Sequence, residues 1–104
     1  MPVVRLRSWE VKSGMEKQAR QELDKIYSIR REARGYLFTI EMVAPHNPHH
    51  ISILAVWKDS GSADAFAVQD HTMSHLAAMR RWASESSLVG DVYDAKIDLP
   101  NLPK

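Results

Sequence analysis

Two histidines four residues apart, His71 and His75, are the side chains of this sequence best placed to do chemistry. On a helix, positions i and i+4 lie on one face, and Met79 and Trp82 continue that face. An imidazole on such an apolar stripe is either a packed core histidine or part of the wall of a ligand pocket. The spacing also suits two ligands of a helical metal site, but no third ligand stands at a fixed spacing, so we expect no metal site here.

A second group of candidate residues, Arg5, Arg7 and Trp9, falls on one face of a predicted strand. If that face looks towards helices, the guanidinium groups lie in a semi-enclosed space and need anionic or carbonyl partners. Alternatively, they lie at a sheet edge or at the rim of a dimer. The possible partners are Glu41, Asp64, Asp70 and a ligand carboxylate.

The composition indicates one ordinary globular domain over residues 1–104. The chain is 44% hydrophobic and 26% charged, with a formal net charge of +1, so nothing in it requires a nucleic-acid or membrane partner. It has no cysteine, which removes disulfide and thiolate chemistry. The N-terminus does not resemble a signal peptide, and the longest apolar run, Ile53–Trp57, is far short of the ~20 residues that span a membrane. We expect a cytoplasmic protein.

Residue alternation predicts the strands, and helical periodicity with capping signals predicts the helices. Ser13 and Glu16 form a capping-box pattern at the start of a helix that runs to about Ala33, and Gly35 is well placed to end it in the left-handed conformation. The predicted order is strand Val3–Val11, this helix, strand Tyr36–Val43, loop Ala44–His50, strand Ile51–Trp57, helical segments from about Ser62 and from about His71 to Ser84, strand Val89–Asp98, and an extended tail Leu99–Lys104.

This β-α-β-β-α-β order is that of the ferredoxin-like fold, an α+β class with an antiparallel sheet and the helices on one face. The other face of the sheet is then bare, although it carries large apolar side chains that monomers rarely expose. A homodimer that pairs two sheets would cover it. We further expect solvated positions for the loop histidines and for the basic cluster at the end of the first helix: His46, His49, His50, Arg30, Arg31 and Arg34.

Several short segments, taken together and in order, resemble the antibiotic biosynthesis monooxygenase family. They are VVRLRSWEV, the turn ARGYL, the strand ILAVWK and the helical segment DHTMSH. The resemblance covers almost the whole chain and implies a dimeric α/β barrel. The most similar branch is that of the heme-degrading monooxygenases, which implies His75 as a heme-iron ligand. That branch has an asparagine and a second tryptophan at the positions of Arg7 and Phe66.

The wider family includes oxygenases that need no metal or flavin, and in these a deprotonated phenol or quinol passes an electron directly to O₂. The resemblance thus implies a cofactor-independent monooxygenase, an oxidoreductase for a small aromatic substrate. Such chemistry requires a base, a cation for the oxyanion and a dry aromatic pocket. We assign His75 or His71 as the base and Arg7 as the cation, with pocket walls from Trp9, Trp57, Phe66 and Met79. The alternatives are heme binding through His75 and a non-catalytic, ligand-binding dimeric barrel.

Overall fold

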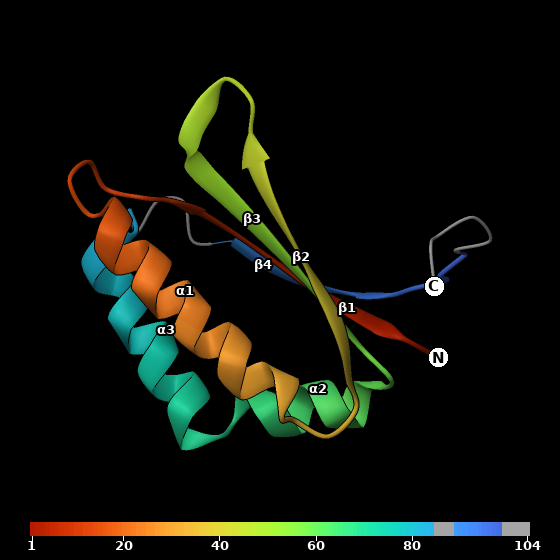
Figure 1. The fold of residues 1–104 in the computed structure, drawn as a ribbon. Coiled ribbons are helices and arrows are strands. Elements are labelled where there is room, and N and C mark those ends of the chain that lie inside the picture. The colour runs from red at the N-terminus through yellow and green to blue at the C-terminus, as the bar shows by residue number, and fades with distance from the viewer. Residues whose placement is uncertain (85–88, 99–104) are drawn as a thin grey trace.

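The computed structural model describes residues 1–84 and 89–98 of the chain (Figure 1). Over these residues the elements are β1 (Val3–Glu10), α1 (Glu16–Arg31), β2 (Tyr36–Ala44), β3 (Asn47–Trp57), α2 (Ser60–Ala67), α3 (Asp70–Trp82) and β4 (Val89–Asp94). The predicted α+β order is confirmed, with the second helical part divided in two as expected. The predicted tail Leu99–Lys104 lies outside the described residues.

The strands form one antiparallel sheet in the order β2-β3-β1-β4, as the ferredoxin-like fold requires. All the described helices lie against the same face of it (Figure 1). In the central pair of strands, Arg7 lies opposite Ile53 and Trp9 opposite Ile51. Because strand residues alternate between faces, Arg5 joins Arg7 and Trp9 on the face that the helices cover.

The core lies between this face and the helices, in two adjoining clusters. One is built around Trp9 and Trp82, whose rings are 6.0 Å apart, and it includes Leu23 and Met79. The other is built around Trp57, which packs against Phe66 at 5.1 Å between ring centroids and against Ile26 and Ala63. The predicted stripe of His75, Met79 and Trp82 on α3 is buried.

The start of α1 differs from the predicted capping box. The helix begins at Glu16, and no side chain caps it; instead the Met15 amide donates to the Lys12 carbonyl. The Glu16 carboxylate reaches the amide of Gly14 at 3.2 Å, one residue later than the box requires. The prediction for Gly35 is confirmed, because its φ is +81°. A Cβ at that position would overlap the side chain of Ser62, so the turn also packs closely on the start of α2.

The predicted loop Ala44–His50 is wrong, because β2 and β3 extend through most of it and pair as far as Ala44 with Asn47. Glu10 on β1 holds this extension, since its carboxylate accepts from the Asn47 amide at 3.0 Å and lies 2.9 Å from His50 Nδ1. His49 approaches Glu16 at 3.5 Å. These histidines therefore tie the hairpin to its neighbours rather than lying free in a solvated loop.

The sheet face away from the helices carries exposed apolar side chains. Ile40, Met42 and Tyr93 alternate with the inward residues of their strands and are 46%, 39% and 50% exposed. Figure 1 shows no described element over this face. The homodimer inferred from the sequence remains a prediction. No helix within the described ranges has the length and apolar character needed to cross a membrane.

Candidate active site

A cavity of about 60 Å³ lies between β1, β3 and the helices. Its lining combines aromatic and aliphatic walls with cationic groups, and contains no carboxylate among the described residues. The lining residues that matter for chemistry are Arg5, Arg7, Arg30, His75, Thr72, Trp9, Trp57 and Phe66. Arg5, Arg7, Trp9, Trp57, Phe66 and His75 were candidates from the sequence, through strand alternation, the helical stripe and the family resemblance taken together.

Two arginines of β1 enter the cavity in different electrostatic situations. Arg5 forms an ion pair of 2.6 Å with Asp64 of α2, one of the predicted partners. The Arg7 guanidinium has no ion pair or hydrogen bond within residues 1–84 and 89–98. Burial, and then the nearby charge of Arg5, lower the pKa of Arg7. A guanidinium nevertheless stays protonated in proteins, so Arg7 is a charge without a counter-charge.

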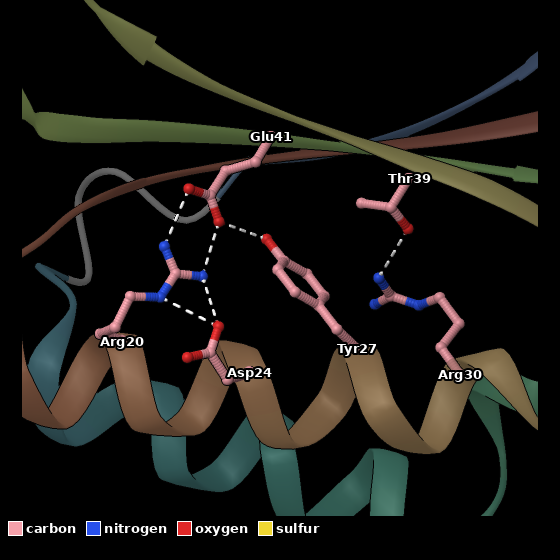
Figure 2. Close-up of polar contacts among 6 residues, drawn as sticks. All are labelled: Arg20, Asp24, Tyr27, Arg30, Thr39 and Glu41. Carbon is pink, nitrogen blue, oxygen red and sulfur yellow. Dashed lines mark hydrogen bonds and ion pairs between the residues drawn. The ribbon is translucent and has the colours of Figure 1, made fainter.

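Glu41, another predicted partner for the arginines, is bound elsewhere (Figure 2). Its two carboxylate oxygens accept from Arg20 at 2.8 and 2.9 Å, and the Tyr27 hydroxyl donates to one of them at 2.6 Å. Arg20 also bonds to Asp24, one turn along α1. The Arg20 hydrogen bonds lower the pKa of Glu41, and burial raises the pKa of Tyr27. This network fastens α1 to β2 and leaves Glu41 unavailable to Arg7.

His75 is buried between α3 and α1, and only 6% of it is exposed. Its Nδ1 lies 3.2 Å from the Glu22 carboxylate. Burial lowers the pKa of His75; the charges of Arg30 and Arg7 act in the same direction, while Glu22 opposes them. The imidazole is therefore neutral near pH 7. Because a carboxylate can only accept, Nδ1 carries the proton and Nε2 is the free, basic nitrogen.

The other two candidates on α3 lie outside the cavity lining. His71 packs edge-on against Phe66 at 5.2 Å, and it lines a groove between α1 and α3 on the outer side of the helices. His75 and Glu22 line that groove too, so His75 separates the groove from the cavity. Met79 is packed in the core beside the tryptophan pair. Of the two histidines, the structure thus brings His75 and not His71 to the cavity.

Arg30 was expected on a solvated helix face, and this expectation is wrong. Its side chain is partly buried, donates to Thr39 at 3.4 Å, and lies 5.8 and 5.9 Å from the ring centres of Tyr27 and Phe66. Burial lowers the pKa of Arg30. Its spacing of four residues from the buried Ile26 was the signal that could have placed it at the cavity.

Two further polar groups of the lining have no partner among the described residues. They are the indole Nε1 of Trp57 and the hydroxyl of Thr72, both buried. An indole N–H is only a donor and a hydroxyl is a donor and an acceptor, so both can bond a ligand or a water. Within the described ranges, no three His, Asp or Glu side chains come close enough together to hold a metal ion.

Several solved structures share this fold at low sequence identity. SnoaB, a cofactor-independent oxygenase from Streptomyces nogalater, superposes with a TM-score of 0.82 at 15% identity, over 96% of this chain and 98% of that one. The chain shares the fold of antibiotic biosynthesis monooxygenases. One such protein matches with a TM-score of 0.79 at 13% identity, over 91% of this chain and 99% of its own.

A candidate antibiotic biosynthesis monooxygenase from Deinococcus radiodurans matches with a TM-score of 0.84 at 17% identity, over 97% of this chain and 99% of that one. No protein-family model matches the sequence, and neither does any curated protein. The α+β, ferredoxin-like fold of the chain is therefore confirmed, whereas the dimeric barrel that the resemblance implied stays a prediction. At these identities the agreement concerns the backbone arrangement, and the chemistry has to be argued from the cavity.

Proposed function

We propose that the protein belongs to the antibiotic biosynthesis monooxygenases and oxidises a small phenol- or quinol-type substrate in the cavity, without a metal or organic cofactor. One observation carries the proposal: a buried histidine and an unpaired arginine line the same aromatic-walled space. The names of structures that share the fold, including a cofactor-independent oxygenase, agree with it.

His75 is the base. Its lowered pKa keeps it neutral, and Glu22 holds its Nδ1 proton, so Nε2 can accept the phenolic proton. Glu22 lines the outer groove and not the cavity. A proton taken from the substrate therefore has a route through the imidazole towards solvent, while the substrate itself stays in the enclosed space.

Arg7 holds the oxyanion that this proton transfer creates. Once substrate binding has positioned it, this partly desolvated charge stabilises a phenolate better than water does, because nothing further has to reorganise during the reaction. Trp9, Trp57 and Phe66 supply the walls against which an aromatic ring stacks.

The reaction balances without an external reductant. The phenolate gives one electron to O₂, the two radicals combine to form a C–O bond, and the resulting hydroperoxide loses water. One oxygen atom enters the substrate, which leaves as a quinone, and the other leaves as water together with the two hydrogens that the substrate has lost.

The size of the cavity sets one condition on this proposal. A volume of about 60 Å³ holds a few water molecules, whereas ligand pockets usually measure ~300 Å³ or more. An aromatic substrate can enter only if long side chains move aside. Arg7 and Arg30 are the flexible parts of the lining, since neither is held by a carboxylate among the described residues. We therefore expect ligand binding to reposition them.

Heme degradation, the alternative raised by the sequence, fits these residues less well. Nε2 of His75 is free for a metal, but a porphyrin needs far more room than the cavity has. Charged Arg7 and Arg30 would also have to be desolvated against its face, which costs several kcal/mol in the absence of a counter-charge. We expect weak binding in a hemin titration, and no loss of the Soret band with ascorbate and O₂.

The test is oxygen uptake with a panel of naphthols, hydroquinones and anthrones, in the presence of a chelator. We expect turnover by the wild type and loss of ~100-fold or more in kcat for His75→Ala, the range of a general base. The matched control is His50→Ala, which removes a histidine paired with Glu10 away from the cavity. Binding of these compounds without oxygen uptake would instead establish the non-catalytic barrel, and tight hemin binding that depends on His75 would restore the heme alternative.

A further inference from the structure

The charges of the cavity are unbalanced, and this imbalance identifies a class of ligand. Within residues 1–84 and 89–98, three guanidinium groups and a histidine line the cavity, and the nearby carboxylates that the structure pairs are bound to groups other than Arg7 and Arg30. Asp64 is paired with Arg5, Glu41 with Arg20 and Tyr27, and Glu22 with His75. Among the described residues, none of the protein partners considered for the β1 arginines, Glu41, Asp64 and Asp70, forms an ion pair with Arg7. A carboxylate from a ligand is the remaining partner.

Arg7 and Arg30 are the unbalanced charges. Arg7 has no partner among the described residues, and Arg30 has one long hydrogen bond to a hydroxyl and two aromatic faces. Burial lowers the pKa of both, but an arginine does not escape burial by losing its proton. Partly buried cations without a counter-charge cost free energy unless an anion joins them.

The unpartnered polar groups beside them point to the same kind of ligand. The Trp57 indole nitrogen and the Thr72 hydroxyl are buried without partners, and Nε of Arg5 is as well. Each can donate a hydrogen bond. A lining that offers donors and no carboxylate acceptor suits a ligand group with several acceptor oxygens. A guanidinium fork matches the two oxygens of a carboxylate.

We propose that the cavity selects aromatic hydroxy acids whose hydroxyl and carboxylate are adjacent, with the carboxylate bound by Arg7 and Arg30 and the phenolic hydroxyl presented to His75. Arg7 has enough donors to hold both the carboxylate and the neighbouring phenolate oxygen. The inference rests on the proposed function for its hydroxyl part, whereas its carboxylate part concerns binding alone. A phenolate exists only after His75 has taken its proton. The carboxylate is charged on arrival, so it orients the ring before any proton moves.

Matched ligands test this on the wild-type protein. Quenching of tryptophan fluorescence gives the affinities of 1-naphthol, 1-hydroxy-2-naphthoate, its methyl ester and 1-naphthyl phosphate at constant ionic strength. We expect the hydroxynaphthoate to bind at least tenfold more tightly than the naphthol or the ester. Equal affinities would overturn the proposal, and tighter binding of the aryl phosphate would overturn the carboxylate as the selected group.

Variants then assign the effect to the arginines. We expect Arg7→Gln and Arg30→Gln each to weaken hydroxynaphthoate binding about tenfold while changing naphthol binding less than twofold. Arg80→Gln, at an exposed position of α3, is the control and should change neither. Equal weakening of both ligands by Arg7→Gln, with native circular dichroism, would overturn the assignment.

These binding measurements are independent of turnover. Selective binding of the carboxylate without oxygen uptake would leave this inference standing and end the proposed oxygenase function. Oxygen uptake with neutral naphthols that bind as tightly as the acid would support the oxygenase function and overturn the selection of carboxylates.

Discussion

His75 of α3 and Glu22 of α1 meet at 3.2 Å across the contact between the two helices, with the imidazole on the cavity side and the carboxylate on the groove side. The pair fixes which nitrogen of His75 is basic. It also connects the packing of two helices to the protonation of one side chain, so its effects can be measured in stability as well as in activity.

The burial of His75 should make stability depend on pH. In the unfolded chain its pKa is near 6.5, and in the folded protein it is lower, so the unfolded state binds the proton first on acidification. The contribution of neutral His75 is complete above pH ~6.5 and is lost as the pH falls towards the folded pKa. Urea unfolding between pH 7.5 and 5.5 should show a smaller loss for His75→Gln than for the wild type. Identical losses would contradict a buried, neutral His75.

Glu22→Gln should lower the pKa of His75 further, because Glu22 is the group that raises it. We expect the imidazole titration in NMR to move to lower pH and the acidic limb of kcat/KM to move with it. The control is His50→Gln, which removes a histidine away from the cavity and should leave the His75 titration unchanged. A merely structural role for Glu22 would lower stability and leave the titration in place.

The contacts of Glu41 should stabilise the packing of α1 on the sheet (Figure 2). Glu41→Gln removes the charge that Arg20 and Tyr27 share, and we expect it to cost about 1 kcal/mol, since the network is partly exposed. A double-mutant cycle with Tyr27→Phe should give a coupling of ~0.5 kcal/mol or more. Additive losses in urea unfolding would show that the hydroxyl and the carboxylate act separately.

Gly35→Ala should be the more harmful of two matched glycine substitutions. Both Gly35 and Gly14 have positive φ, at +81° and +86°, so alanine costs about 1–2 kcal/mol at either position. A Cβ at Gly35 also overlaps Ser62, whereas nothing lies within 4 Å at Gly14. We expect thermal unfolding to show a clearly larger drop in Tm for Gly35→Ala. Equal drops in Tm would show that Ser62 and α2 can shift to accommodate the extra Cβ without a loss of stability.

The uncovered face of the sheet should bind a second copy of the chain. Light scattering should report about 24 kDa, twice the 11.9 kDa of one chain, for an interface of roughly 2,000 Å². Ile40→Glu places a charge on the exposed apolar face and should give monomers. The control Val68→Glu alters an equally apolar, exposed residue after α2 and should leave the mass unchanged. A wild-type monomer at micromolar concentration would contradict the dimer.

Regular patterns made the fold and half of the site predictable. Alternation placed Arg7 and Trp9 on one common face, which the structure shows to be the covered one, and the i,i+4 stripe placed His75 on the buried side of α3. The partner of His75 was not predictable, because Glu22 comes from a helix 53 positions away and carries no local signal. Met79 was expected in the pocket wall but packs in the core, because a buried helical stripe does not distinguish core positions from cavity positions. Arg30 was expected in solvent because of its charge, although its periodic position on the first helix pointed to the buried side.

The two central strands, β1 and β3, are hydrogen-bonded on both sides, and this limits how the cavity can adapt to a ligand. β1 pairs with β3 and β4 along its length, and β3 pairs with β1 and β2, so the backbone beneath Arg5, Arg7 and Trp57 is held from both sides. Such amides exchange their hydrogens slowly, and only through large openings of the structure. The floor of the cavity is therefore fixed, and its capacity to accept ligands of different shape resides in side-chain torsions and in the helices.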